Sequence, residues 1–184
     1  MSLESDADRI ISWSPLLVPG LLQTPGYARE TISGTTTTRT PDEINALVEV
    51  RQARQAVLSR PGQPLDLWAV IHEAALRKRF AARPATMRDQ LCRLSEICEL
   101  PNVTLQLMPL NSTAHPGLLG SFLLATFPGP TPEAALLENV AGATYVEGED
   151  TGPFASALAR IRAAALSVED TMVRIGQLAE GQGR

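Results

Sequence analysis

The stretch Val18-Pro19-Gly20-Leu21-Leu22-Gln23-Thr24-Pro25-Gly26-Tyr27-Ala28-Arg29, called the elbow below, is the least generic segment of the chain. Pro19-Gly20 predicts a turn, because proline presets φ and glycine tolerates the strained conformation beside it. Thr24-Pro25 predicts a helix start, with threonine as the cap and proline at the first helical position. Leu21 and Leu22 are too apolar to face water between two such breaks. We therefore expect an ordered elbow packed against the domain, although a simple connection between two helices is the alternative.

The clearest helix start follows the elbow, at Thr40-Pro41-Asp42-Glu43. Thr40 caps the helix and Glu43, three residues on, closes a capping box. The helix is predicted to continue to about Ser59, before Pro61-Gly62. Its expected apolar face consists of Ile44, Leu47, Val48, Val50, Val57 and Leu58.

Three polar residues, Arg51, Arg54 and Gln55, fall inside this apolar arc. A charge on an apolar face must be paired or must line a cavity, because an unpaired buried charge is very costly. The arginines either extend to water and meet structural carboxylates, or they point into a polar cleft. Both interpretations stay open at this point.

The remaining elements are read from periodicity and turn residues. Helices are predicted over residues 2–13, 27–33, 74–80 and 85–99, from residue 150 onward, and again from Ser167. Strands are predicted over residues 65–71, 103–108, 119–127 and 134–138, the last two as an antiparallel pair, with loops over 34–38 and 109–120. These elements predict one α+β domain over residues 6–180, in which a small mixed β-sheet packs against N-terminal and C-terminal helices. We expect residues 1–5 to be a tag remnant or linker and residues 181–184 to be a disordered tail.

Two further polar residues stand at informative positions. Glu73 directly follows a predicted strand and opens a helix, where a carboxylate can cap the helix or serve a functional site. Gln90 lies within the apolar face of the helix over residues 85–99. A buried glutamine needs partners for both ends of its amide, so we expect Gln90 to join a hydrogen-bond network or to contact a ligand.

The composition excludes several classes of function. The net charge of −4 argues against nucleic-acid binding by this segment, because a phosphate-binding surface needs clustered Lys and Arg. Cys92 and Cys98 lie about 120° apart on one predicted helix, so they share neither a disulfide nor a metal ion. With two histidines in the chain, we expect no metal site and no cofactor. No signal peptide and no apolar run of membrane-spanning length is present, so we expect a cytoplasmic protein without membrane contact.

Several short motifs then follow one another in a specific order. They are the elbow; Arg51 with Arg54-Gln55; Glu73-Ala74-Ala75-Leu76; Met87 with Gln90-Leu91; Pro101-Asn102-Val103-Thr104; Pro109; His115 to Phe122; and Leu137-Glu138. From about Ile10 to Leu178, this order resembles the C-terminal domain of uncharacterised function of actinobacterial transcriptional regulators. In those proteins an N-terminal helix-turn-helix module of the Xre type binds DNA; here that module would precede Asp6. Leu136-Leu137 departs from the Val/Tyr pair of the relatives, so no role of a tyrosine in that strand is carried over.

The resemblance implies a regulatory domain that senses a small molecule or a small partner protein. It touches DNA only through the module absent from this chain. The candidate ligand-binding or polar-network residues are Gln23, Arg51, Arg54, Gln55, Glu73, Gln90, His115 and Glu138. We expect one connected network in which the buried arginines pair with Glu73 or Glu138, and which holds either the fold or a ligand.

Two other hypotheses accompany this one. A small hydrolytic enzyme could use His115 with Glu73 or Glu138 for acid–base chemistry, but no nucleophile motif or phosphate-binding loop accompanies these residues. We therefore predict that the protein is not an enzyme. The apolar helices from Phe154 to Leu178 could also form a symmetric homodimer interface, which is compatible with the regulatory hypothesis.

Overall fold

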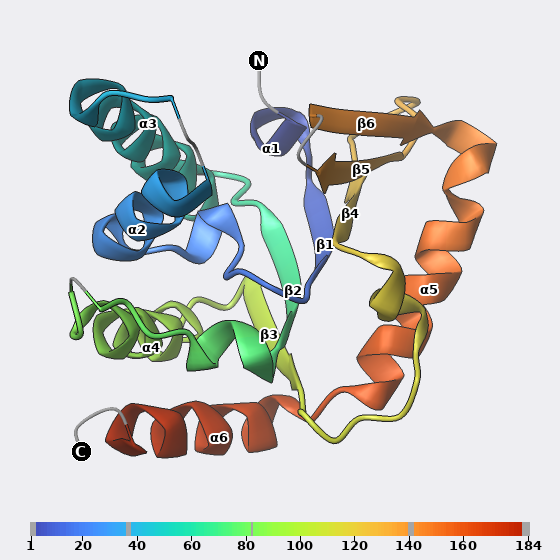
Figure 1. Cartoon of the computed structure of the whole chain (residues 1–184). Coiled ribbons are helices and arrows are strands. Elements are labelled where there is room, and N and C mark those ends of the chain that lie inside the picture. The colour runs from blue at the N-terminus through green and yellow to red at the C-terminus, as the bar shows by residue number, and fades with distance from the viewer. Residues whose placement is uncertain (1–2, 36–37, 82, 140–141, 182–184) are drawn as a thin grey trace.

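A six-stranded mixed sheet forms the centre of a single α+β domain (Figure 1). The structure, a computed structural model, describes residues 3–35, 38–81, 83–139 and 142–181. The strands β1 (Arg9–Ser14), β2 (Asp66–His72) and β3 (Val103–Met108) are parallel, and β4 (Phe122–Thr126), β5 (Ala134–Asn139) and β6 (Gly142–Glu147) continue the sheet in antiparallel fashion. The spatial order is β3-β2-β1-β4-β5-β6, so the parallel part of the sheet meets the antiparallel part where β1 pairs with β4.

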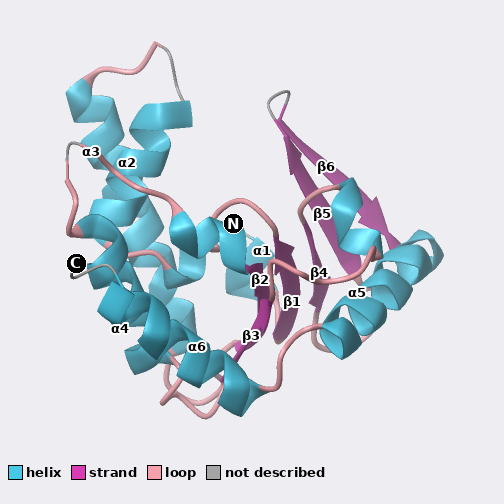
Figure 2. Cartoon of the chain, turned by 60° about the horizontal axis from the view of Figure 1, so that its bottom comes forward, coloured by secondary structure: helices cyan, strands magenta, loops and turns pink. Residues whose placement is uncertain are grey.

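Helices cover both faces of the sheet, and Figure 2 shows α5 on the side opposite α4 and α6. The helices are α1 (Leu3–Asp6), α2 (Pro25–Thr35), α3 (Pro41–Arg54), α4 (Thr86–Ile97), α5 (Gly152–Ala164) and α6 (Val168–Gly181). Residues alternate between the faces along each strand. Leu67 and Ile71 of β2 face the larger core under α4, whereas Val70 joins the smaller core under α5.

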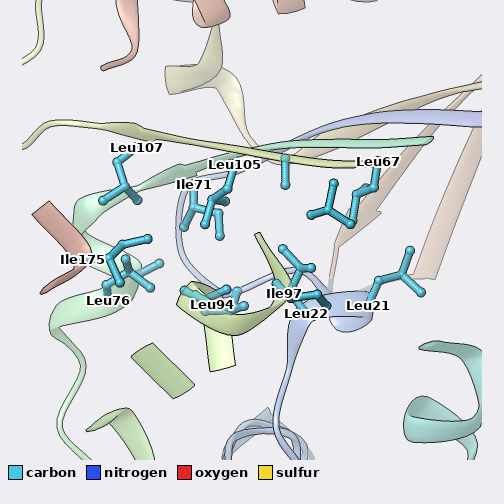
Figure 3. Packing of buried hydrophobic residues seen from close by; sticks show 14 of the residues in the cluster. Leu21, Leu22, Leu67, Ile71, Leu76, Leu94, Ile97, Leu105, Leu107 and Ile175 are labelled. Carbon is cyan, nitrogen blue, oxygen red and sulfur yellow. The ribbon is translucent and has the colours of Figure 1, made fainter. Parts of the chain in front are cut away.

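The elbow packs into the larger core, as predicted. Leu21 and Leu22 lie in a short 3-10 helix, Gly20–Leu22, and both are buried. Figure 3 shows them beside Leu94 and Ile97 of α4, facing strand residues such as Leu67. Helix α2 begins at Pro25, as Thr24-Pro25 indicates, and packs against α3 through a separate small cluster. The elbow therefore joins this helix pair to the body of the domain.

The prediction of a helix over residues 2–13 is wrong for most of its length. Helix α1 ends at Asp6, and Arg9–Ser14 forms β1, paired with β2 on one side and β4 on the other. Buried Ile10 faces the larger core and buried Trp13 the smaller one. Pairing on both sides decides the conformation of these six residues, because β-branched and aromatic residues suit a buried strand. Ser2 lies outside the described residues, and Leu3 to Ser5, expected to be a tag remnant or linker, form most of α1.

The long helix is shorter and less apolar than its periodicity indicates. The capping box at Thr40 and Glu43 is confirmed, but α3 ends at Arg54 and a 3-10 helix, Gln55–Leu58, follows. Val48 is the buried residue of α3, while Val50 is 57% exposed. Because α3 packs against α2 and not against the sheet, a narrow apolar face around Val48 is enough to anchor this helix.

The other elements follow the predictions closely. The predicted strands correspond to β2, β3, β4 and β5, the β4–β5 pair is antiparallel, and α4, α5 and α6 are present. Helix α2 continues to Thr35, into the loop expected over residues 34–38, of which residues 36–37 lie outside the described part. Residues 74–80 were predicted to be helical, but a 3-10 helix covers only Glu73–Arg77. Strand β6 was not predicted; five of its six residues are exposed, so it lacks the alternation that marks a half-buried strand.

Within the described ranges, no helix combines the length and apolarity that crossing a bilayer requires.

Two buried hydroxyl groups allow a test of the packing. Ser12 of β1 is buried and its oxygen makes no hydrogen bond with the described residues, whereas the Thr171 oxygen accepts the Leu107 N–H at 3.0 Å. A buried polar group without a partner costs about 1–3 kcal/mol. We expect Ser12→Ala to leave the free energy of unfolding unchanged or to raise it by up to about 1 kcal/mol. Thr171→Val should lower it by about 1–3 kcal/mol, because the Leu107 N–H loses its acceptor.

Denaturant unfolding of both variants beside the unmodified chain measures these differences. A loss of more than about 1 kcal/mol in Ser12→Ala would contradict the placement of Ser12.

Candidate functional site

The elbow turns its backbone polar groups toward amide side chains from α3, α4 and its own sequence. The first is Gln90 of α4, which is fully buried. Its Nε2 donates to the Leu22 carbonyl at 2.7 Å, and its Oε1 accepts the Thr24 N–H at 2.8 Å. One side chain thus satisfies a donor and an acceptor of the elbow. The predicted hydrogen-bond network of Gln90 is present and is made with backbone groups.

A second glutamine, Gln23, is also buried and holds the elbow from inside. Its Nε2 donates to the Val18 carbonyl at 2.7 Å, and its Oε1 accepts from Nη1 of Arg51 at 2.9 Å. The backbone carbonyl of Gln23 accepts from Nε2 of Gln55 at 2.7 Å and from Nε2 of Gln52 at 3.2 Å. Residues from the end of α3 therefore fasten the elbow from the side opposite Gln90.

Arg51 carries a charge that no carboxylate of the described residues neutralises by direct contact. Its described hydrogen bond goes to the neutral amide of Gln23, and its side chain lies against Gly20. Burial is the main cause that lowers the pKa of the Arg51 guanidinium, and the positive charge of Arg54 adds to it. The negative charges of Glu138 and Glu4 act in the opposite direction. The guanidinium remains protonated, so the end of α3 holds a partly buried positive charge.

Arg54, one turn further on, pairs with Glu4 of α1. The Glu4 side chain is 11% exposed, whereas that of Arg54 is 43% exposed. This pair connects the C-terminal end of α3 to the N-terminal helix of the domain.

Both arginines border a hollow of about 190 Å³ on the surface of α2 and α3. We call it the arginine hollow, and its lining consists of Ile32, Thr35, Arg39, Leu47, Val50, Arg51 and Arg54. Its surface combines three guanidinium-bearing side chains with three aliphatic ones. Such a surface suits a negatively charged group attached to an apolar stem.

A larger hollow of about 350 Å³ lies elsewhere, over α1, β5 and β6. Leu3, Asp6, Phe127, Thr131, Pro132, Ala134, Tyr145 and Glu147 line it, and none of the sequence-predicted candidates is among them.

Glu73 belongs to a different cluster from the elbow arginines. It is buried at the end of β2, and its carboxylate accepts hydrogen bonds from Arg77 at 2.5 and 2.8 Å and from Arg174 of α6 at 2.7 and 3.2 Å. Burial alone raises the pKa of this carboxyl, but the two arginines outweigh it and hold the pKa below its usual range. The expected pairing of Arg51 with Glu73 is therefore not formed, because Arg77 and Arg174 take both carboxylate oxygens.

His115 forms a third cluster, on the α5 side of the sheet. Its Nδ1 accepts the Gly117 N–H at 3.1 Å, its ring lies edge-on to Trp13 with centroids 5.2 Å apart, and its Nε2 is buried without a described partner. The Trp13 Nε1 donates to the Gly117 carbonyl at 2.8 Å. A Cβ at Gly117 would come within 2.5 Å of the Trp13 ring, so only glycine fits there. This geometry requires a neutral imidazole, because Nδ1 accepts a hydrogen bond and therefore cannot carry a proton.

Glu138 lies on the exposed part of β5 and acts on Arg51 only through its charge. The eight candidate residues thus divide into the elbow group, the Glu73 cluster, the His115 cluster and this outlying carboxylate. A single connected network does not form.

Several residues of these clusters were not predicted: Glu4, Arg39, Gln52, Arg77, Trp13, Gly117 and Arg174. Arg77 could have been found, since it stands four residues after Glu73 and both would share one helical face. Arg174 follows Glu73 by 101 residues, and no local pattern indicates that contact.

No group of three or more His, Cys, Asp or Glu side chains in the described ranges could hold a metal ion. The two cysteines are unpaired, and burial raises the pKa of Cys98 to about 11, so this thiol stays protonated at neutral pH.

The double hydrogen bond of Gln90 gives a direct stability prediction. Gln90→Met keeps the length of the side chain but leaves the Thr24 N–H and the Leu22 carbonyl without partners. We expect the free energy of unfolding to fall by about 2–6 kcal/mol, the sum of two unsatisfied buried groups. Gln90→Glu keeps the acceptor for Thr24 but places an oxygen against the Leu22 carbonyl, so it should also destabilise. Unfolding in urea measures both, and a loss below about 1 kcal/mol in Gln90→Met would be incompatible with these contacts.

His115 predicts a pH dependence of stability. Burial, together with the charge of His72, lowers the pKa of His115 below its ordinary value near 6.5. The unfolded chain therefore binds a proton at His115 more readily than the folded one. The stability that neutral His115 contributes to the folded state is complete above about pH 6.5. It is lost as the pH falls from about 6.5 through the lower pKa of the folded state.

The matched variant is His115→Asn, whose side-chain oxygen can still accept the Gly117 N–H but does not titrate. We expect the decrease in unfolding free energy between pH 7.5 and 5.5 to be smaller in His115→Asn than in the unmodified chain. Equal slopes would show that His115 is not held in its neutral form.

Comparison with known proteins gives one result. No curated protein and no solved structure matches the chain. A protein family described as "Domain of unknown function (DUF5753)" matches residues 1–177, which is nearly the whole sequence. The chain therefore belongs to the DUF5753 family.

Proposed function

We propose that this domain is the regulatory part of a transcription regulator whose helix-turn-helix DNA-binding module lies outside the chain. It binds a small-molecule effector or a small partner protein and passes the bound state on to that module. The observation that supports this proposal is the arginine hollow together with its ion pair to α1. The link to a DNA-binding module rests on the order of motifs in the sequence.

The charge in the arginine hollow favours a binding role. Arg51 is partly buried, hydrogen-bonded to a neutral amide and next to a second arginine, and the charges of Glu138 and Glu4 offset its burial only in part. A bound anion would lower the energy of this arrangement, since buried positive charges are stable only when they are paired. The Glu4–Arg54 pair offers a route for transmission, because a ligand that engages Arg54 would change the contact that holds α1.

A binding role also agrees better with the placed residues than hydrolysis does. Glu73 is engaged by two arginines, and a carboxyl with a lowered pKa is a weak general base. His115 uses Nδ1 to accept the Gly117 N–H, and burial and the charge of His72 lower its pKa. We therefore propose that the protein is not a hydrolase.

Homodimerisation remains part of the proposal, but not through the main apolar stripes of the last helices. Leu158 and Ile161 of α5 are buried against the sheet, and Ile175 and Leu178 of α6 join the larger core. Val173 of α6 is 61% exposed and could contribute to a contact. Light scattering of the purified chain measures this directly.

The test of the regulatory role is a thermal-shift screen of the purified chain against metabolites and candidate small partner proteins. A ligand at a hundred times its dissociation constant should add about 2.7 kcal/mol to the free energy of unfolding. Hydrogen–deuterium exchange of the hit complex then follows residues 3–8. We expect binding to alter exchange in α1, because the Glu4–Arg54 pair connects α1 to the hollow.

Arg160→Gln on α5 serves as the control variant, since it removes one exposed arginine far from the elbow in sequence. If no metabolite and no partner stabilises the chain, or if a bound ligand leaves α1 unchanged, the regulatory proposal fails.

A further inference from the structure

We infer that the arginine hollow binds a carboxylate carried on a short aliphatic stem. This inference specifies the ligand class of the site proposed above and rests on that proposed function for its regulatory meaning.

Arg51 and Arg54 provide the guanidinium groups that would bind the carboxylate of the ligand. Arg51 uses one described hydrogen bond, from Nη1 to Gln23, so a guanidinium group with five N–H donors keeps others for a ligand. Arg54 already binds a carboxylate of the chain, that of Glu4, and its side chain is still 43% exposed. Glu4 shows that a carboxylate fits the edge of this group, where guanidinium and carboxylate geometries match.

The apolar part of the ligand is set by Ile32, Leu47 and Val50. Val50 projects from α3 at 57% exposure, next in sequence to Arg51. An aliphatic stem laid over Leu47 and Val50 would remove apolar surface from water, and the buried Ile32 forms the floor beneath them. Inorganic anions lack this part of the interaction.

The hollow is small, and its volume limits the ligand. About 190 Å³ is below the 300–1,000 Å³ typical of drug-sized ligands. It fits a carboxylate and a few carbon atoms, either as a free short acid or as the end of a longer molecule.

Binding would compete with an internal contact. A ligand carboxylate that engages Arg54 must share this guanidinium with Glu4 or displace it. Displacement would free Glu4 and loosen α1, which is the change that the proposed regulation needs. Removal of the Glu4 charge should therefore make ligand binding tighter.

The experiment titrates the full chain with hexanoate, hexan-1-ol and sulfate, by isothermal calorimetry or nuclear magnetic resonance. The alcohol carries the stem without the charge, and sulfate carries charge without the stem. We expect hexanoate to bind at least about tenfold more tightly than either, the difference expected from one charge-assisted hydrogen bond or from two buried CH₂ groups. Equal binding of sulfate would overturn the role of the apolar lining, and equal binding of the alcohol would overturn that of the arginines.

Three variants locate the site, with Arg160→Gln again as the control. Arg54→Gln should weaken hexanoate binding about tenfold through loss of a charge-assisted hydrogen bond. Val50→Asp should abolish binding, because it places a tethered carboxylate at the rim; since Val50 is exposed, the fold should be retained. Glu4→Gln should strengthen binding.

Unchanged affinity in Val50→Asp, with the fold verified by circular dichroism, would place the bound acid elsewhere and overturn the inference. If none of the three probes binds while the metabolite or partner screen still yields a ligand that alters α1, only the carboxylate assignment fails. If that screen is also negative, both proposals fail.

Discussion

The structure depends on supplying hydrogen-bond partners to the backbone of the elbow. This segment breaks regular structure at two prolines yet buries Leu21 and Leu22, so the carbonyls of Val18 and Leu22 and the N–H of Thr24 need partners beyond the short 3-10 helix Gly20–Leu22. Gln90 and Gln23 provide partners from within the protein. The penalty for an unpaired buried group exceeds the net gain from an ordinary hydrogen bond, so these amides are needed to keep the elbow buried. Without that anchorage, the α2–α3 pair would lose its attachment to the sheet.

Charges in the domain fall into two kinds, and the difference points to function. Glu73 is buried with two arginines that supply four hydrogen bonds, an arrangement that satisfies the carboxylate fully and holds α6 to the end of β2. Arg51 is also removed in part from water, but its described hydrogen bond goes to a neutral amide, and the repulsion from Arg54 opposes the attraction of Glu138 and Glu4. Structural ion pairs explain the first arrangement. The arrangement around Arg51 resembles a binding site for an anion.

Local sequence predicted what local chemistry controls, and it failed where distant contacts decide. The capping box at Thr40 and the buried amide of Gln90 follow from spacing alone, and both are present. The helix predicted through Ile10 was wrong, because six residues between two neighbouring strands take their conformation from pairing that no local pattern encodes. The contact of Glu73 with Arg174 spans 101 residues and depends on how α6 returns to the sheet. Polar residues on apolar faces were thus identified correctly as unusual, but their partners were not.

The position of the arginine hollow, more than its chemistry, makes regulation plausible as its role. Helices α2 and α3 pack together through a small cluster of their own, with Ala28, Ile32 and Val48 at its centre, and Tyr27 of α2 joins the larger core. A unit with few buried apolar contacts opens at lower free energy than a core element, and moving parts of regulatory proteins come from that end of the range. The same pair carries Arg54, which reaches Glu4 in α1, the first described helix of the chain. A ligand at this place would act on the described ion pair between Arg54 and Glu4, so a modest binding energy could change how the N-terminal segment is held.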